Sequence, residues 1–256
     1  MPHSEAESSA PRVGSISEDG EVPMSVRTRD AAAVGILFIV ASVTAILGGS
    51  LAALPLEDAD YLLTIAGQDT QVISGVLLLV IQTVAVVGIA VLLYPVLSRE
   101  HAGLALGYIG ARTIEGVMVL VGALSVLALV TLSRDQAEAV GAPPLGDVLA
   151  STYDWSYLLG PMLFFSVSAL ILYPLLLRGR LVPVWLSIWG LAGGLLLLAR
   201  TIAEMYGADL SGLAQGLLAA PIGINEMVLA LWLIIKGFTL TPARHSAPAG
   251  LEHTPR

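Results

Sequence analysis

The chain contains no cysteine, so it can form no disulfide, no thiolate metal site and no cysteine nucleophile. Charged residues are also scarce, since they make up 12% of the 256 residues against 56% for hydrophobic residues. A water-soluble domain of this length needs a charged surface, and so few charges could not cover one. The composition therefore predicts a protein whose main solvent is lipid.

Histidine is also rare, since the chain has four, and all of them lie outside the long apolar runs. The four histidines are His3, His101, His245 and His253. An intramembrane haem pair or a serine-histidine dyad would need a histidine within an apolar run. No HExxH zinc motif or glycine-rich phosphate loop occurs, and Tyr153-Asp154 falls in a predicted loop without the GxGD partner of an aspartyl protease. We therefore predict a noncatalytic protein with no metal site and no cofactor.

Six apolar runs are each long enough to cross about 30 Å of hydrocarbon. They predict transmembrane helices over about 31–54, 72–97, 104–132, 157–177, 181–198 and 217–235. The predicted fold class is all-α, a polytopic bundle of six spans in one membrane domain, 31–238. Residues 1–30 lack an apolar core and a secretory signal, so we predict a disordered acidic tail there, with a second short tail over 239–256.

Basic residues favour alternate connections, as the positive-inside rule describes. Of the twelve, nine fall on one side of the predicted topology, two on the other and one within a span. The nine are Arg12, Arg27, Arg29, Arg99, Arg178, Arg180, Lys236, Arg244 and Arg256. Both termini are therefore predicted to be cytoplasmic, in a protein of the inner (plasma) membrane.

The net charge of −8 arises mainly in the N-terminal tail and in two connections predicted to face outward. These connections carry Glu57, Asp58, Asp60 and Asp69, and then Asp135, Glu138, Asp147 and Asp154. Neither set has the alternating acids and central glycine of an EF-hand, so we interpret both as solvated loops rather than calcium sites. Nucleic acid is not expected as a partner. The expected partners are membrane lipids and a small ion, proton or lipid ligand.

Two charges, Arg112 and Glu115, interrupt the third apolar run. A charge at mid-membrane depth costs roughly 2.5–3.5 kcal/mol on insertion scales, so it normally faces a partner, a cavity or a pathway. The i, i+3 spacing places both side chains on one helix face. At about 1.5 Å per residue, Asn225 and Glu226 of the last run and Gln82 of the second lie near the same depth. These five residues form the candidate polar cluster.

Two hypotheses remain open for this cluster. In the first, Glu115 or Glu226 exchanges a proton or cation against Arg112, in a small transporter or an ion- or lipid-interacting protein. In the second, Arg112 locks two helices together in a noncatalytic scaffold, and Gln82 and Asn225 satisfy the remaining donors and acceptors. A water-filled cavity that reaches the cluster would favour the first hypothesis, because a structural lock needs none.

A second charged pair, Arg200 and Glu204, has i, i+4 spacing near the outer end of the fifth run. We predict an interfacial role for it, since long side chains at that depth can reach water. Pro221 and Gly223 precede Glu226, so the last helix either is kinked at its polar residues or begins near this proline.

Small residues predict where helices pack closely. Gly103 and Gly107, and likewise Gly190 and Gly194, have the GxxxG spacing that lets two backbones approach. We therefore expect one helix contact at each pair.

Three segments resemble the DUF4386 family of prokaryotic integral membrane proteins. They are LALGYIGARTIEG over 104–116, LVPVWLSIWG over 181–190 and PIGINEMVLALWLIIKGF over 221–238. The resemblance covers about 31–238, and its motifs occur in the family's order, including Arg-x-x-Glu-Gly and the final Glu-Met-Val-Leu-Ala-x-Trp. Asn225 stands where the family often carries glutamine, which keeps the amide. The resemblance implies a multi-span membrane protein and no particular activity.

Overall fold

A computed structural model describes residues 24–58, 60–136 and 142–239. The elements in chain order are α1 (Met24–Ala53), η1 (Leu54–Glu57), α2 (Tyr61–Gly67), α3 (Asp69–Gln136), α4 (Ala142–Tyr157), η2 (Leu158–Phe164), α5 (Phe165–Arg178), α6 (Val184–Met205) and α7 (Gly212–Ile235). Over these residues every element is helical, which confirms the all-α prediction. The predicted tails lie mostly outside the described residues, although α1 begins at Met24, within the segment predicted as the first tail.

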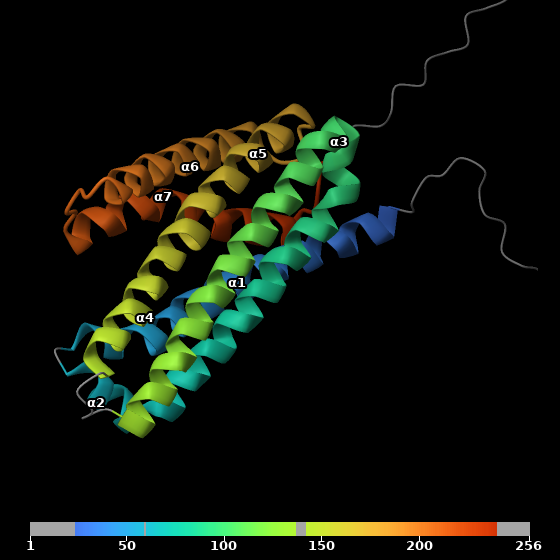
Figure 1. Ribbon diagram of the computed structural model, residues 1–256. Coiled ribbons are helices and arrows are strands. Elements are labelled where there is room, and N and C mark those ends of the chain that lie inside the picture. Colours follow the sequence, from blue (N-terminus) through green and yellow to red (C-terminus); the bar gives the residue numbers. More distant parts are fainter. Residues whose placement is uncertain (1–23, 59, 137–141, 240–256) are drawn as a thin grey trace, which may run out of the picture.

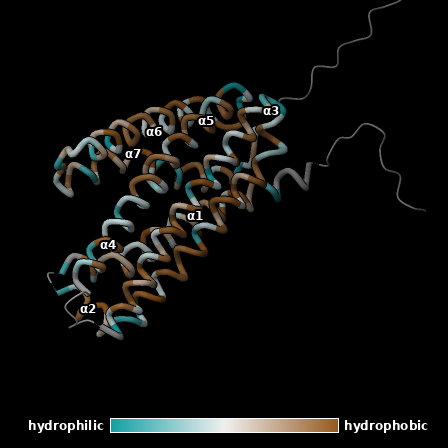
Figure 2. Tube along the Cα trace, in the orientation of Figure 1, coloured by the Kyte–Doolittle hydropathy of each residue, from teal (hydrophilic) through white to brown (hydrophobic). Residues whose placement is uncertain are grey.

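Five helical stretches are long and apolar enough to cross a membrane: Arg29–Ala53, Asp69–Arg134, Pro144–Arg178, Val184–Met205 and Gly212–Ile235. Large apolar side chains remain exposed along them, as at Ile46 and Leu124, which are 68% and 66% exposed. Figure 2 shows apolar residues along the helices and polar residues gathered near their ends. Such a surface is suited to lipid, in which helices satisfy their own backbone groups.

The helix α3 folds back on itself, so one apolar stretch contains the second and third predicted runs. At His101 the backbone is extended (φ −165°, ψ 103°), and His101 Nδ1 accepts the backbone N–H of Leu104 at 3.1 Å. The two arms, 69–100 and 102–136, lie side by side in Figure 1. Arg134 near the end of the second arm pairs with Asp69 at the start of the first, with 2.6 Å between Nη2 and Oδ2.

We predicted a loop before the fourth run. This prediction is wrong, because Ala142–Tyr157 forms the helix α4. Asp147 and Asp154, expected in a solvated loop, lie in α4, as does Tyr153, which is buried. The prolines at 143 and 144 favoured a loop in the sequence, but proline is tolerated in the first turn of a helix, where its missing N–H has no partner anyway. Of the other predicted outward acids, Glu138 lies outside the described residues.

Glycine sets the close contacts between helices. At Gly35 of α1 an added Cβ would meet the carbonyl of Ala230 in α7, and at Gly190 of α6 it would meet the ring of Tyr173 in α5. The predicted contact at Gly190 and Gly194 is therefore confirmed. At Gly107 an added Cβ would lie 3.7 Å from Ile171 of α5, which is an ordinary contact, and at Gly103 it would meet only His101, so this pair allows no close approach of two backbones.

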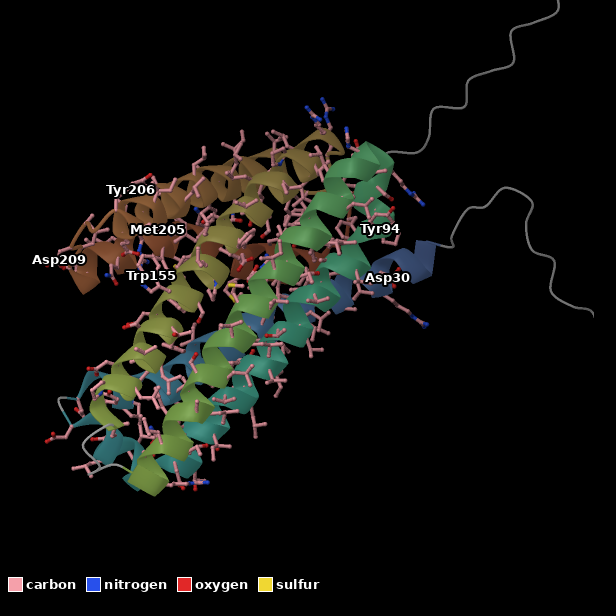
Figure 3. All side chains as sticks on the ribbon, in the orientation of Figure 1. Asp30, Tyr94, Trp155, Met205, Tyr206 and Asp209 are labelled. Carbon is pink, nitrogen blue, oxygen red and sulfur yellow. The ribbon has the colours of Figure 1, made fainter. Side chains whose placement is uncertain are left out.

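The turn of α3, the α5–α6 turn and the end of α7 lie at one end of the molecule (Figure 1). There the carboxyl of Glu100 lies beside Gly179, and the backbone N–H of Thr239 donates to Leu181 O at 2.8 Å. Figure 3 shows Asp30 and Tyr94 toward this end and Tyr206 and Asp209 at the opposite end of α6. The basic residues of the two turns and of the end of α7 therefore lie at one end of the molecule. They are Arg99, Arg178, Arg180 and Lys236.

The buried apolar residues form two separate clusters, and the polar residues of α3 lie between them. In the first arm, Leu79 belongs to one cluster and Ala85 to the other. In the second arm, Tyr108 belongs to the same cluster as Ala85, and Val119 belongs to the same cluster as Leu79. Gln82, Arg112 and Glu115 occupy the gap, so the candidate cluster interrupts the core at one level.

Candidate functional site

Arg112 joins two helices through two carboxylates. Its Nη1 donates to Glu115 Oε2 at 3.1 Å and Oε1 at 3.3 Å, within the second arm of α3. Its Nη2 donates to Glu226 Oε1 of α7 at 3.1 Å. The side chains of Arg112 and Glu115 are each 3% exposed, and that of Glu226 is 12% exposed. The depth arithmetic correctly placed Glu226 as the second partner.

Two aromatic residues that the sequence did not single out complete the environment of the guanidinium. Arg112 Nε donates to the hydroxyl of Tyr108 at 3.3 Å, and the ring of Phe165 lies 4.9 Å from Arg112 Cζ. A cation over an aromatic face is attracted by the ring quadrupole, more strongly where water is excluded. The spacing of Tyr108, one turn before Arg112, could have indicated this contact, whereas Phe165 comes from a distant segment.

A cavity of about 540 Å³ reaches the ion-paired residues. Its walls come from α1, both arms of α3, α4, η2, α5 and α7. Arg112, Glu115, Glu226 and Gln82 line it. The other lining residues are apolar apart from the hydroxyl-bearing Ser42, Ser156, Tyr153 and Tyr157. We call this the central cavity.

The π-helical element η2 shapes one wall of the central cavity. It contains Pro161, which cannot donate a backbone hydrogen bond, and the N–H of Phe165 reaches back to Gly160 O, the i−5 pattern of a π-helix. Pro161 and Met162 of η2 line the cavity. The first residue after η2 is Phe165, and Arg112 stacks on its ring. Single π-turns of this kind occur often at functional sites.

The two candidate amides have different places. Gln82 lines the central cavity, and its Oε1 is buried without a hydrogen-bond partner. Asn225 is fully buried and donates through Nδ2 to Leu186 O of α6 at 3.0 Å, away from the cavity. Neither amide hydrogen-bonds to the ion pairs, so the prediction that they satisfy leftover donors and acceptors there is wrong.

The Arg200–Glu204 pair lies outside the central cavity. Arg200 Nε donates to Glu204 Oε1 at 3.0 Å, and Arg200 Nη1 donates to Gln215 O at 3.0 Å. The two side chains are 9% and 13% exposed, so both are largely covered by other parts of the protein. This pair ties the end of α6 to the first turn of α7.

The helix α7 runs unbroken from Gly212, nine residues before Pro221, so the proline neither begins the helix nor unwinds it. Gly193 of α6 lies against the backbone of Ile222, where an added Cβ would come within 2.9 Å of the Ile222 nitrogen. This close approach holds α6 against α7 one turn before Glu226.

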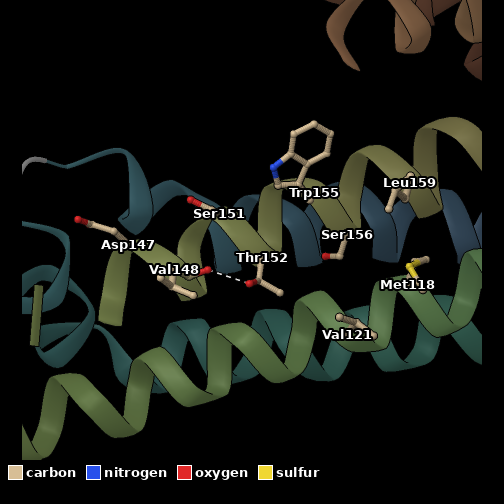
Figure 4. Close-up of a pocket in the computed structure, with 9 residues that line it drawn as sticks. All are labelled: Met118, Val121, Asp147, Val148, Ser151, Thr152, Trp155, Ser156 and Leu159. Atoms are coloured by element: carbon tan, nitrogen blue, oxygen red, sulfur yellow. Dashed lines mark hydrogen bonds between the residues drawn. The ribbon is translucent and has the colours of Figure 1, made fainter. Parts of the chain in front are cut away.

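A second hollow, of about 520 Å³, lies between α4 and the second arm of α3 (Figure 4). Two of its hydroxyls are engaged locally, since Thr152 donates to Val148 O and Ser156 to Tyr153 O. Trp155 lies at its edge and is 52% exposed. No buried charge lines this hollow, so the central cavity is the candidate site. Among the described residues, no three His, Cys, Asp or Glu side chains are placed to hold a metal ion.

Comparison with known proteins gives a family but no activity. One family model, described as a domain of unknown function (DUF4386), matches residues 33–237. No curated protein and no solved structure matches the chain. The function must therefore be argued from the site itself.

Proposed function

The chain belongs to the DUF4386 family, and we propose that it is a small multi-pass transporter or ligand-binding protein of the plasma membrane. In this proposal Glu115 or Glu226 exchanges a proton or a cation against Arg112. Membrane lipids surround the protein, and the exchanged group reaches the carboxylates through the central cavity.

The observation that carries the proposal is the contact between the central cavity and the ion pairs. A structural lock is most stable when it is dry and packed on every side, whereas this cluster adjoins about 540 Å³ of space. Ionisable residues within apolar spans commonly mark the path of an ion, a proton or a substrate.

Charge balance gives the exchange its chemical basis. One guanidinium faces two carboxylates, and the cavity surfaces of α1, α4, η2 and α5 add no charged side chain, only the phenols of Tyr153 and Tyr157. With both carboxylates ionised, one negative charge stays uncompensated in a low-dielectric site, which is costly. Binding of a proton or a cation removes that charge.

The same proposal includes six membrane crossings, with each arm of α3 crossing once and both termini cytoplasmic. The reversal of the chain at His101 supports two separate crossings by α3. The basic residues that lie at the same end of the molecule as this reversal support a cytoplasmic position for that end.

A noncatalytic scaffold is the alternative function. The observation that favours it is the pairing of Arg112, because each guanidinium nitrogen already donates to Tyr108, Glu115 or Glu226. In that case the cavity is incidental, and no carboxyl of the cluster titrates in the folded protein.

Infrared spectroscopy of the protein in lipid nanodiscs separates the two functions, because a protonated carboxylic acid has a C=O stretch that a carboxylate lacks. We expect a buried acid band that appears and disappears with pH, and that is lost in Glu226→Gln or Glu115→Gln. The matched control Glu204→Gln, which alters a carboxyl outside the cavity, keeps the band.

The scaffold function predicts the opposite set of results. No cluster carboxyl titrates while the protein stays folded, and Glu226→Gln lowers the melting temperature without a spectral change at the acid band. Either outcome would overturn proton exchange at this site.

A further inference from the structure

We infer that the central cavity binds a single-chain amphiphile with a cationic, hydrogen-bond-donating head group, and that this ligand enters from the bilayer between α1 and α7. The inference rests on the proposed function of the same site and specifies its ligand class.

The central cavity is elongated along the helices. Its lining residues on α1 extend from Phe38 to Gly49, and those on the second arm of α3 from Arg112 to Gly122. At 1.5 Å per residue each wall is about 15 Å long. A space of this shape suits an alkyl chain better than a compact solute.

The charged residues occupy one end of that length. Gly35 of α1 packs against Ala230 of α7, and Glu226 lies one turn before Ala230, which puts its carboxylate near the level of Phe38. Toward the other end the cavity surfaces of α1 and α7 are apolar, with Ile46 and Ala220 among them. The site therefore has a charged end and an uncharged, mainly apolar body, which matches the two parts of an amphiphile.

The sign of the head group follows from which atoms remain unpaired. All three guanidinium nitrogens of Arg112 already donate, so an anionic head group would compete with two carboxylates for the same positive charge. Two acceptors of the lining lack a donor: Gln82 Oε1 is buried without a partner, and Glu226 makes its ion pair through Oε1 alone. An ammonium group supplies both the missing donors and the missing positive charge.

The lateral opening follows from the exposed residues of the lining. Val43 and Ile46 of α1 are 46% and 68% exposed, and Ile224 of α7 is 54% exposed, although all three line the cavity. In Figure 1, α1 and α7 are close near the α3 turn and diverge away from it. The opening is thus rimmed by apolar side chains on helices apolar enough to face lipid, which favours access from the bilayer.

The test uses dodecylamine, dodecanoate and dodecanol, which share one chain length and differ in head-group charge. Saturable binding of each radiolabelled compound is measured to the full-length protein in phosphatidylcholine nanodiscs, with empty nanodiscs subtracted. We expect dodecylamine to bind at least about tenfold more tightly than dodecanoate, a difference of about 1.4 kcal/mol. Equal binding of the three, or tighter binding of dodecanoate, would overturn the inference.

Two matched variants locate the site. Ile46→Trp fills the opening and is expected to weaken dodecylamine binding at least about fivefold, while Leu124→Trp is expected to leave it unchanged. Leu124 is 66% exposed, almost as much as Ile46, but lies away from both hollows. An equal effect of the two substitutions would place the amine elsewhere. The titrating acid band of Glu226 or Glu115 is measured separately. If the band is intact but dodecylamine does not bind, the ligand class is overturned and proton exchange still stands.

Discussion

Among single residues, Arg112 determines the geometry of the site. Its guanidinium bridges a carboxylate of its own helix and one of α7, and the ring of Phe165 covers it. Removing one partner of a buried ion pair is far more costly than replacing the whole group by apolar side chains, because it leaves an uncompensated charge. The stability of the folded protein should therefore depend on the balance of the cluster rather than on the number of its hydrogen bonds.

Arg112→Leu is expected to lower the free energy of unfolding by about 3–5 kcal/mol, because two buried carboxylates lose their counter-charge. The triple variant Arg112→Met, Glu115→Leu, Glu226→Leu should recover most of that loss. Both changes are measured by thermal or denaturant unfolding in the same detergent. A single variant as stable as the wild type would show that water already screens these charges.

The residues of the cluster could be predicted because charge is conspicuous in an apolar run and helix rise converts sequence position into depth. Their surroundings could not. Phe165 is one apolar residue among many in its run, so no pattern indicates that it stacks on Arg112. Asn225 was predicted beside Glu226 from adjacency, but successive helical residues point about 100° apart, and its side chain faces α6 instead.

Among the helices, α3 and α4 show where apolar pattern is enough and where it is not. The runs 72–97 and 104–132 predicted the two arms of α3, since hydrophobic length alone sets them. The helix α4 was missed because its segment holds prolines and acids that are typical of loops. Contact with the second arm of α3 overrides that preference, as the close approach of Gly122 to Tyr153 shows.

The turn of α3 allows a direct test of whether its arms cross the membrane separately. Because the chain has no cysteine, Arg99→Cys and Asp60→Cys can each be probed with a membrane-impermeant maleimide. We expect Arg99→Cys to react only from the cytoplasmic side, and Asp60→Cys, like the control Asp209→Cys, only from the other side. Labelling of Arg99→Cys and Asp60→Cys from the same side would rule out a crossing by the first arm.

For the molecule as a whole, the central cavity lies where two packed units meet and separate. The layer of α5, α6 and α7 contacts α1 and α3 near the α3 turn, and the two units diverge toward α2 (Figure 1). The buried clusters lie on either side of the charged residues, so neither closes over them. In our proposal, the central cavity at this junction gives the carboxylates access to the bilayer.

The most direct test of that account is the reaction of the membrane-embedded protein with a hydrophobic carbodiimide, located by mass spectrometry. The carbodiimide adds to a protonated carboxyl and rearranges to a stable N-acylurea, so only an acid that takes a proton and can be reached from lipid is modified. The account predicts an adduct at Glu226 or Glu115, formed more slowly as the pH rises and more slowly in Ile46→Trp than in Leu124→Trp. Absence of any adduct at both residues, in protein that remains folded, would contradict it.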